Sequence, residues 1–321
     1  MMERYSSLDG LRSIAAFGIV LMHINVNGAY FTNGTVASII NSFGDFVFLF
    51  MVISAFSISN GYYKRIINNQ TSIFDFYKKR IIKIWPVLFV LVLVDLVVSF
   101  TESSLYEAFA NLTLLFGFLP NNDLSVIGVA WEIGVLFIFY FMYPFFCFLM
   151  KEKKRIWISF FVFTLFTCLC SNYFGLRKND FIFDIPFFIV GCLLFLYKDK
   201  LRPVWNVAFT IIALFLYIVL NKNIVTKLLL SSSILSLSIC FPNSKVLSNR
   251  IMKFISRNSL EIYLSHMAFY RLLEKLNMLH PFKSNIISFI FVNVSVLMCC
   301  IVFSILFNRV LNLLKKGIDI S

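Results

Sequence analysis

The sequence predicts an all-α, polytopic integral membrane protein with about ten transmembrane helices and one short re-entrant or interfacial helix. Of its 321 residues, 60% are hydrophobic, only 14% are charged and 40 are Phe. A soluble globule of this length would expose much of that apolar surface, and a disordered chain would contain far less of it. The apolar residues also gather into runs of about 20, the length that crosses a bilayer.

Ten apolar runs are long enough to span, which takes roughly 17–25 mostly apolar residues in a helix. They cover residues 10–28, 38–60, 84–101, 128–149, 156–172, 181–197, 204–220, 224–241, 258–276 and 286–308. A further apolar piece, 105–119, is shorter and is followed by Pro120, so we expect the re-entrant or interfacial helix there. No internal repeat or low-complexity tract interrupts the series. We therefore expect a single membrane-embedded domain over residues 1–321, with no appended soluble domain.

The basic residues alternate from linker to linker, which predicts the orientation of the chain. If 105–119 does not cross, 22 of the 29 Lys and Arg residues fall on one side of the membrane. Basic loops are retained in the cytoplasm, so both termini are expected there, with the protein in the cell (inner) membrane. The formal net charge of +13 then serves orientation and contact with membrane lipids, and no nucleic-acid partner is expected.

The seven cysteines show neither a disulfide framework nor the spacing of a metal site. All lie within or beside apolar runs, and neither a Cys-x-x-Cys pair nor a Cys/His ligand spacing occurs. We interpret them as small apolar packing residues, and no metal is expected.

The first span contains two ionisable residues on one helical face. Arg12 and His23 are eleven residues apart, which returns a helix to within about 20° of its starting direction and raises it by about 16 Å. Ionisable groups at membrane depth are functional candidates by default. A guanidinium at the cytoplasmic mouth could hold an anionic group, and a deeper imidazole could exchange a proton near neutral pH. The alternative is a snorkelling Arg and a His that only bonds to a neighbouring helix.

Several motifs occur in an order that resembles the acyltransferase-3 family of integral membrane acyltransferases. The opening motif, 8–16 followed by His23, resembles the family signature of Arg, ten residues and His. Five later segments resemble further family motifs, at residues 52–56, 76–86, 131–144, 187–191 and 259–266. The chain departs from the family pattern at Ala55, where the family has Gly, and at Leu136, where it often has Glu.

The resemblance implies an enzyme that transfers an acyl group, usually acetyl from acetyl-CoA, to a hydroxyl of a carbohydrate or lipid-linked saccharide. His23 would act as general base or as a covalent acyl relay, and Arg12 would anchor the acyl-CoA. Lys79, Arg80 and Lys83 would lie near the phosphates of the acyl-CoA, although a patch for anionic lipids is an equal alternative for this basic run.

Four further residues are candidate contacts of the acceptor: Ser54, Trp131, Glu132 and His266. Trp131 could stack on a sugar, and Glu132, the carboxylate nearest to the family's Glu position, could bond to its hydroxyls. His266 could orient either His23 or the acceptor. The alternatives are a Trp of the interfacial aromatic belt and a purely structural His.

The rival function is a transporter or flippase for acyl groups or lipid-linked saccharides, because ten spans, a half-helix and buried polar residues suit one. The sequence shows no inverted repeat and no pair of discontinuous helices that would favour it. A purely structural membrane subunit leaves the shared face of Arg12 and His23 unexplained.

Overall fold

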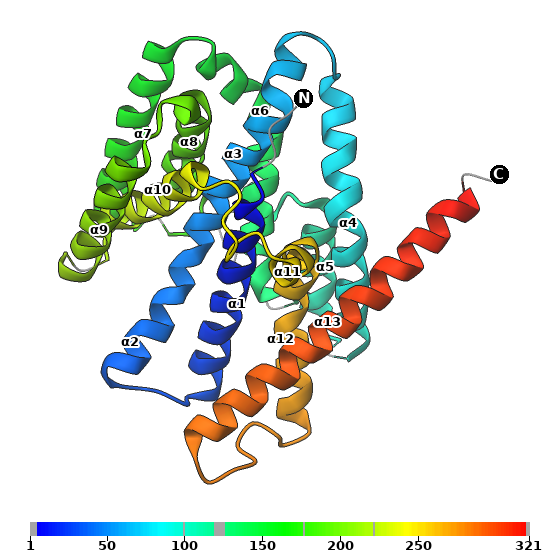
Figure 1. The fold of residues 1–321 in the computed structure, drawn as a ribbon. Helices are drawn as coiled ribbons and strands as arrows, with labels where there is room; N and C mark the ends of the chain where they lie inside the picture. Colours follow the sequence, from blue (N-terminus) through cyan, green and yellow to red (C-terminus); the bar gives the residue numbers. More distant parts are fainter. Residues whose placement is uncertain (1–4, 99, 119–125, 176, 221, 319–321) are drawn as a thin grey trace.

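The computed structural model describes residues 5–98, 100–118, 126–175, 177–220 and 222–318, with side chains described as far as residue 314. In these ranges every regular element is an α-helix or a 3-10 helix and no strand occurs, which confirms the predicted all-α fold. Most helices run up and down in one bundle, and the long α13 crosses it obliquely on one side (Figure 1).

The helices follow one another with short connections. Their bounds are α1 Ser7–Gly28, α2 Gly34–Ser42, η1 Phe43–Asp45, α3 Phe46–Ile67, α4 Ile73–Val98, α5 Glu102–Thr113, η2 Phe116–Phe118, η3 Gly128–Ala130, α6 Trp131–Met150, α7 Lys153–Tyr173, α8 Phe181–Tyr197, η4 Lys198–Lys200, α9 Pro203–Val219, α10 Ile224–Cys240, α11 Arg250–Arg257, α12 Ser259–Lys275 and α13 Asn285–Ile318. Each predicted span coincides with one helix of this series, except that 38–60 covers parts of α2, η1 and α3, and 128–149 covers η3 and most of α6.

Seven helical stretches of the described chain are long and apolar enough to cross a membrane: Ser7–Gly28, Gly34–Ile67, Ile73–Val98, Gly128–Met150, Lys153–Tyr173, Phe181–Lys200 and Asn285–Leu314. The other three predicted spans coincide with α9, α10 and α12, which have 17 residues each. Seventeen residues rise about 26 Å, less than the roughly 30 Å of hydrocarbon in a bilayer. The protein is therefore a membrane protein with seven candidate spans in the described part of the chain, and the predicted count of about ten is not confirmed.

Helix α5 occupies the segment where a re-entrant or interfacial helix was expected. It begins after Thr101, whose hydroxyl accepts a hydrogen bond from the backbone N–H of Ser104 (3.1 Å). Trp85 of α4 holds its far end by donating to the carbonyl of Leu112 (3.1 Å). Twelve residues rise only about 18 Å, too little to cross a bilayer. Its re-entrant or interfacial placement remains a prediction, and Pro120 lies outside the described residues.

Helix α11 was not predicted from the sequence, because the predicted helices were identified from long runs of apolar residues. It has eight residues and is strongly amphipathic, with three basic residues among apolar ones. Such a helix is typical of a membrane surface. It also packs against α1, although none of its residues is buried.

The connections of the bundle lie at two opposite ends. The α3–α4 and α6–α7 connections are at the top of Figure 1, whereas the α1–α2 and α12–α13 connections are at the bottom. Lys151 of the α6–α7 connection is followed by Lys153, Lys154 and Arg155 in the first turn of α7, whereas residues 29–33 of the α1–α2 connection contain no Lys or Arg. This arrangement agrees with the alternation of charge on which the predicted orientation rests.

Helices α3 and α8 approach each other closely because small residues face each other. A Cβ added to Gly191 would lie 2.6 Å from the Cβ of Ala55 and would also collide with the carbonyl oxygen of Val52. Beside this contact, the ring of Phe187 stacks on Phe48 with centroids 4.5 Å apart. Small residues allow such close packing of membrane helices.

Gly191→Leu is expected to separate α3 from α8, because the added side chain has no space against the backbone of Val52. Overpacking of this kind costs about 1–3 kcal/mol or more. We expect a lower Tm in detergent and a loss of monodisperse protein in size-exclusion chromatography. Gly61→Ala, on α3, is the control because nothing lies within 4 Å of its added Cβ. Equal stability of the two variants would contradict this packing.

Candidate active site

Helix α1 lies in the interior of the bundle and positions Arg12 and His23. It packs against α3, α10, α11, α12 and α13. This central position is possible because the buried Ala15, Ala16 and Gly18 keep the helix slim; a Cβ on Gly18 would collide with the ring of Phe46. One regular helix thus places Arg12 and His23 about three turns apart along the protein interior.

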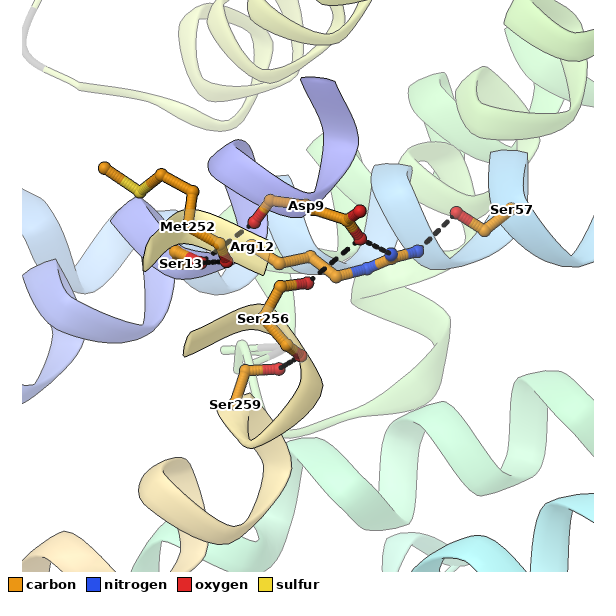
Figure 2. Close-up of polar contacts among 7 residues, drawn as sticks. All are labelled: Asp9, Arg12, Ser13, Ser57, Met252, Ser256 and Ser259. Atoms are coloured by element: carbon orange, nitrogen blue, oxygen red, sulfur yellow. Dashed lines mark hydrogen bonds and ion pairs between the residues drawn. The ribbon is translucent and has the colours of Figure 1, made fainter. Parts of the chain in front are cut away.

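The guanidinium of Arg12 points from α1 toward α3 and is held by polar groups of several helices (Figure 2). It donates to the hydroxyl of Ser57 (2.6 Å) and lies 3.8 Å from the carboxylate of Asp9. That carboxylate accepts a hydrogen bond from the hydroxyl of Ser256 on α11 (3.2 Å). Arg12 is therefore fixed inside the protein, with 28% of its side chain exposed, rather than extended to the membrane surface.

One cavity of about 200 Å³ brings together five residues that the sequence had singled out: Arg12, Ser54, Arg80, Lys83 and Glu132. They come from α1, α3, α4 and α6, and α11 and α12 complete the wall. Three cations and one carboxylate surround this small volume. The balance of charge favours an anionic ligand.

Aromatic rings hold Arg80 beside the cavity. Its guanidinium carbon lies 4.8 Å from the centroid of Tyr62 and 5.7 Å from that of Tyr140. Such cation–π contacts orient a guanidinium without using its N–H donors, and its Nε has no hydrogen-bond partner among the described residues. Lys83 lines the cavity from an exposed position, whereas Lys79 is exposed and does not line it.

Glu132 and Trp131 are adjacent in the chain but differ in their surroundings. Glu132 lines the cavity, is 5% exposed, and its Oε2 has no hydrogen-bond partner in the described part of the chain. Trp131 does not line the cavity, and the ammonium of Lys178 lies 5.5 Å from its ring centroid. A sugar that stacked on Trp131 would compete with Lys178 for the ring.

His23 and His266 do not line the cavity but form a pair beside it. Their ring centroids are 5.3 Å apart. Nδ1 of the buried His266 lies 2.6 Å from the carbonyl oxygen of Tyr263, which makes Nδ1 the protonated nitrogen and leaves Nε2 as an acceptor. No described residue bonds to Nε2. The ring of Tyr263 is 6.0 Å from that of His266 and lines the cavity, so the pair and the cavity are neighbours.

Three residues of the cavity wall had not been singled out individually in the sequence: Ser57, Ser256 and Tyr263. Asp184, which was not singled out either, does not line the cavity but is an electrostatic neighbour of Glu132. Asp184 is fully buried in α8, and neither of its carboxylate oxygens has a partner among the residues described. The signal that could have found it is a carboxylate inside an apolar run. Serine and tyrosine carry no such signal, because both are common in membrane helices without a functional role.

A family model described as an acyltransferase domain, that of acyltransferase-3, matches residues 5–307, nearly the whole chain. The chain belongs to the acyltransferase-3 family. This membership confirms the resemblance seen in the motifs, and with the apolar helices it makes the protein a membrane acyltransferase. The matched region includes the cavity and both histidines of the pair. No curated protein and no solved structure matches the chain.

Glu132→Gln is expected to stabilise the acyltransferase, because it removes a titratable carboxyl whose buried Oε2 has no hydrogen-bond partner among the described residues, and an unsatisfied buried polar atom costs about 1–3 kcal/mol. We expect the Tm in detergent to rise by a few degrees. Glu152→Gln is the control, since Glu152 is 65% exposed and pairs with Arg155 at 2.7 Å, a kind of contact that contributes little. A lower Tm for Glu132→Gln would mean that this carboxylate stabilises the fold.

Proposed function

We propose that this membrane acyltransferase moves an acetyl group from cytoplasmic acetyl-CoA to a hydroxyl of a cell-surface or lipid-linked carbohydrate, such as an O-antigen or a capsule. The observation that carries the proposal is the cavity shared by Arg12, Arg80 and Lys83. In the proposed orientation the protein lies in the inner membrane with both termini in the cytoplasm, so this cationic group faces the side where acetyl-CoA is found.

The cations suit the phosphates of an acyl-CoA. A guanidinium is planar and pairs with two phosphate oxygens at once, and both Arg12 and Arg80 are held in place by other protein groups. Lys83 would meet the ligand at the exposed side of the cavity. Lys79, which is exposed outside the cavity, would attract the polyanion at longer range.

The proposed transfer uses His23 as general base. The acceptor oxygen attacks the thioester carbonyl carbon as its proton passes to His23. The carbon–sulfur bond then breaks, and the leaving CoA thiolate takes the proton from His23. Positioned general bases contribute about 10²–10⁴-fold to such steps. Because His23 lies about 16 Å along α1 from Arg12, the extended pantetheine arm would follow this helix. A covalent acyl-His23 intermediate is the alternative route, which rapid quenching would trap as labelled protein.

His266 is proposed as a positioning residue for His23. Nε2 of His266 can accept a hydrogen bond only in the tautomer that carries its proton on Nδ1, and the hydrogen bond from Nδ1 to the carbonyl of Tyr263 favours that tautomer. An N–H of His23 directed at this nitrogen would leave the other nitrogen of His23 free to take the acceptor's proton. In this arrangement His23 is the catalytic base and His266 is the group that orients it, as in other enzymes whose base is held by a neighbouring side chain.

The acceptor is proposed to enter from the opposite side of the membrane. Glu132 at the beginning of α6 would accept hydrogen bonds from its hydroxyls, since Oε2 has no partner among the described residues. Ser54, in the same cavity wall, would add a hydroxyl contact. Trp131 would stack on a sugar only after Lys178 left its ring.

Radiolabelled acetyl-CoA added to membranes that contain the protein should label the host glycan. We expect His23→Ala to reduce transfer by about 10²-fold or more, and Arg12→Ala to abolish it by loss of the donor site, at unchanged protein level. Arg80→Gln and Lys83→Gln should raise the KM for acetyl-CoA.

Lys154→Gln is the matched control, because Lys154 is exposed in the predicted cytoplasmic set and does not line the cavity. Normal acetylation by His23→Ala would exclude the mechanism. Comparison of the surface glycan of wild-type and deletion strains by NMR, for a lost acetyl signal, would identify the acceptor.

His266→Asn tests the positioning role, because an Asn can still donate to the carbonyl of Tyr263 but has no equivalent of Nε2. We expect kcat to fall by about tenfold or more and its pH profile to shift, with the KM for acetyl-CoA unchanged. If His266 is only structural, the His266→Asn substitution should instead lower the Tm and leave the pH profile of the folded enzyme unchanged.

A further inference from the structure

A second cavity, of about 370 Å³, lies between α4, α12, α13 and the η3 turn. Its wall is mainly apolar, with contributions from Leu91, Val129, Leu264 and Phe303. A volume of this size is within the range of ligand sites in proteins. The acetyl transfer proposed above does not use it.

The cavity runs from a lipid-exposed rim to a buried floor. At the rim, Val94, Val98 and Leu272 are 48%, 57% and 49% exposed, whereas Leu91 and Leu264 on the floor are 6% and 2% exposed. In a membrane, the exposed apolar side chains of α4 and α12 face hydrocarbon. The cavity is therefore accessible to a lipid chain without passage through water.

Charged residues gather at one end of this cavity, where α4 and α12 both end. Arg271 pairs with Asp95 at 3.2 Å, and Lys275, one turn further along α12, also lines the cavity. The lining therefore has one net positive charge. Glu107 is an electrostatic neighbour of Asp95, and its Oε2 accepts a hydrogen bond from the backbone N–H of Val126 (2.9 Å).

We propose that this cavity binds a hydrocarbon chain of a phosphate-bearing membrane lipid, whose phosphate pairs with Arg271 and Lys275. The apolar wall alone cannot select a ligand, because a bilayer is as apolar as the cavity. A phosphate beside a guanidinium and an ammonium supplies the selectivity, since charge-assisted hydrogen bonds are the strong ones. The chain would extend from this charged end toward Leu264.

The lipid would lie directly behind the proposed active site. Tyr263 and Leu264 are neighbours on α12, yet Tyr263 lines the first cavity and Leu264 the second. Val129, in the wall of the lipid cavity, accepts a hydrogen bond from the Tyr263 hydroxyl (2.9 Å). A bound chain would press η3 against α12 and should stabilise the folded protein, whether or not the protein transfers acetyl groups.

The test is the thermal stability of the detergent-purified protein with three probes: phosphatidylglycerol, diacylglycerol, and glycerol 3-phosphate. We expect phosphatidylglycerol to raise the Tm by several degrees, diacylglycerol to raise it less, and glycerol 3-phosphate to leave it unchanged. Lys275→Gln should remove most of the difference between the two lipids. Ala268→Phe, which fills the cavity from an exposed position on α12, should remove the response to both.

Two matched variants control for charge and bulk: Lys283→Gln, an exposed lysine beyond the end of α12, and Ala208→Phe, on an exposed position of α9; neither residue lines the cavity. Both should respond to phosphatidylglycerol like the wild type. Equal responses of Lys275→Gln and Lys283→Gln, equal shifts by the two lipids, or a full shift by glycerol 3-phosphate would each overturn the proposal. If Ala268→Phe does not fold, retention of phosphatidylglycerol by Lys275→Gln in native mass spectrometry decides.

Discussion

The hydrogen bonds that hold the guanidinium of Arg12 inside the bundle set the geometry of the site. A charged group at membrane depth costs about 2.5–3.5 kcal/mol or more, so it stays there only with protein partners. Ser57 on α3, and Asp9 with Ser256, supply those partners and fix α1 against α3 and α11. The basic residues of α4 then meet Arg12 across a single cavity, because α1 cannot turn away from it.

Much of the architecture follows from local properties of the chain. Helix type and approximate bounds depend on runs of apolar residues, so the all-α fold and the helix positions could be predicted. The separation of Arg12 and His23 along α1 follows from helical geometry alone. Five candidate residues from four helices meet in one cavity. Only the order of the family motifs along the chain, and not the spacing of these residues, had suggested that they belong to one site.

Contacts between distant helices could not be predicted, because no local pattern encodes them. The ammonium of Lys178 on the ring of Trp131 and the position of Lys79 outside the cavity both depend on helix rotation and tilt. The contact between His23 and His266 had been only one of two roles considered for His266, and the 5.3 Å separation of their rings depends on the same rotation and tilt. The number of spans could not be predicted from the length of the apolar runs either, because a helix of 17 residues lies at the lower limit of length that spans a bilayer.

The length of α12 has a consequence for the membrane around the enzyme. Its 17 residues include Glu261 near the beginning, Arg271, Glu274 and Lys275 near the end, and His266 in the middle. A helix this short reaches water on both sides only where the bilayer is compressed to match it, an effect known as hydrophobic mismatch. Lipid beside α12 would then be thinner than elsewhere, and the two aqueous phases would approach each other most closely at the histidine pair.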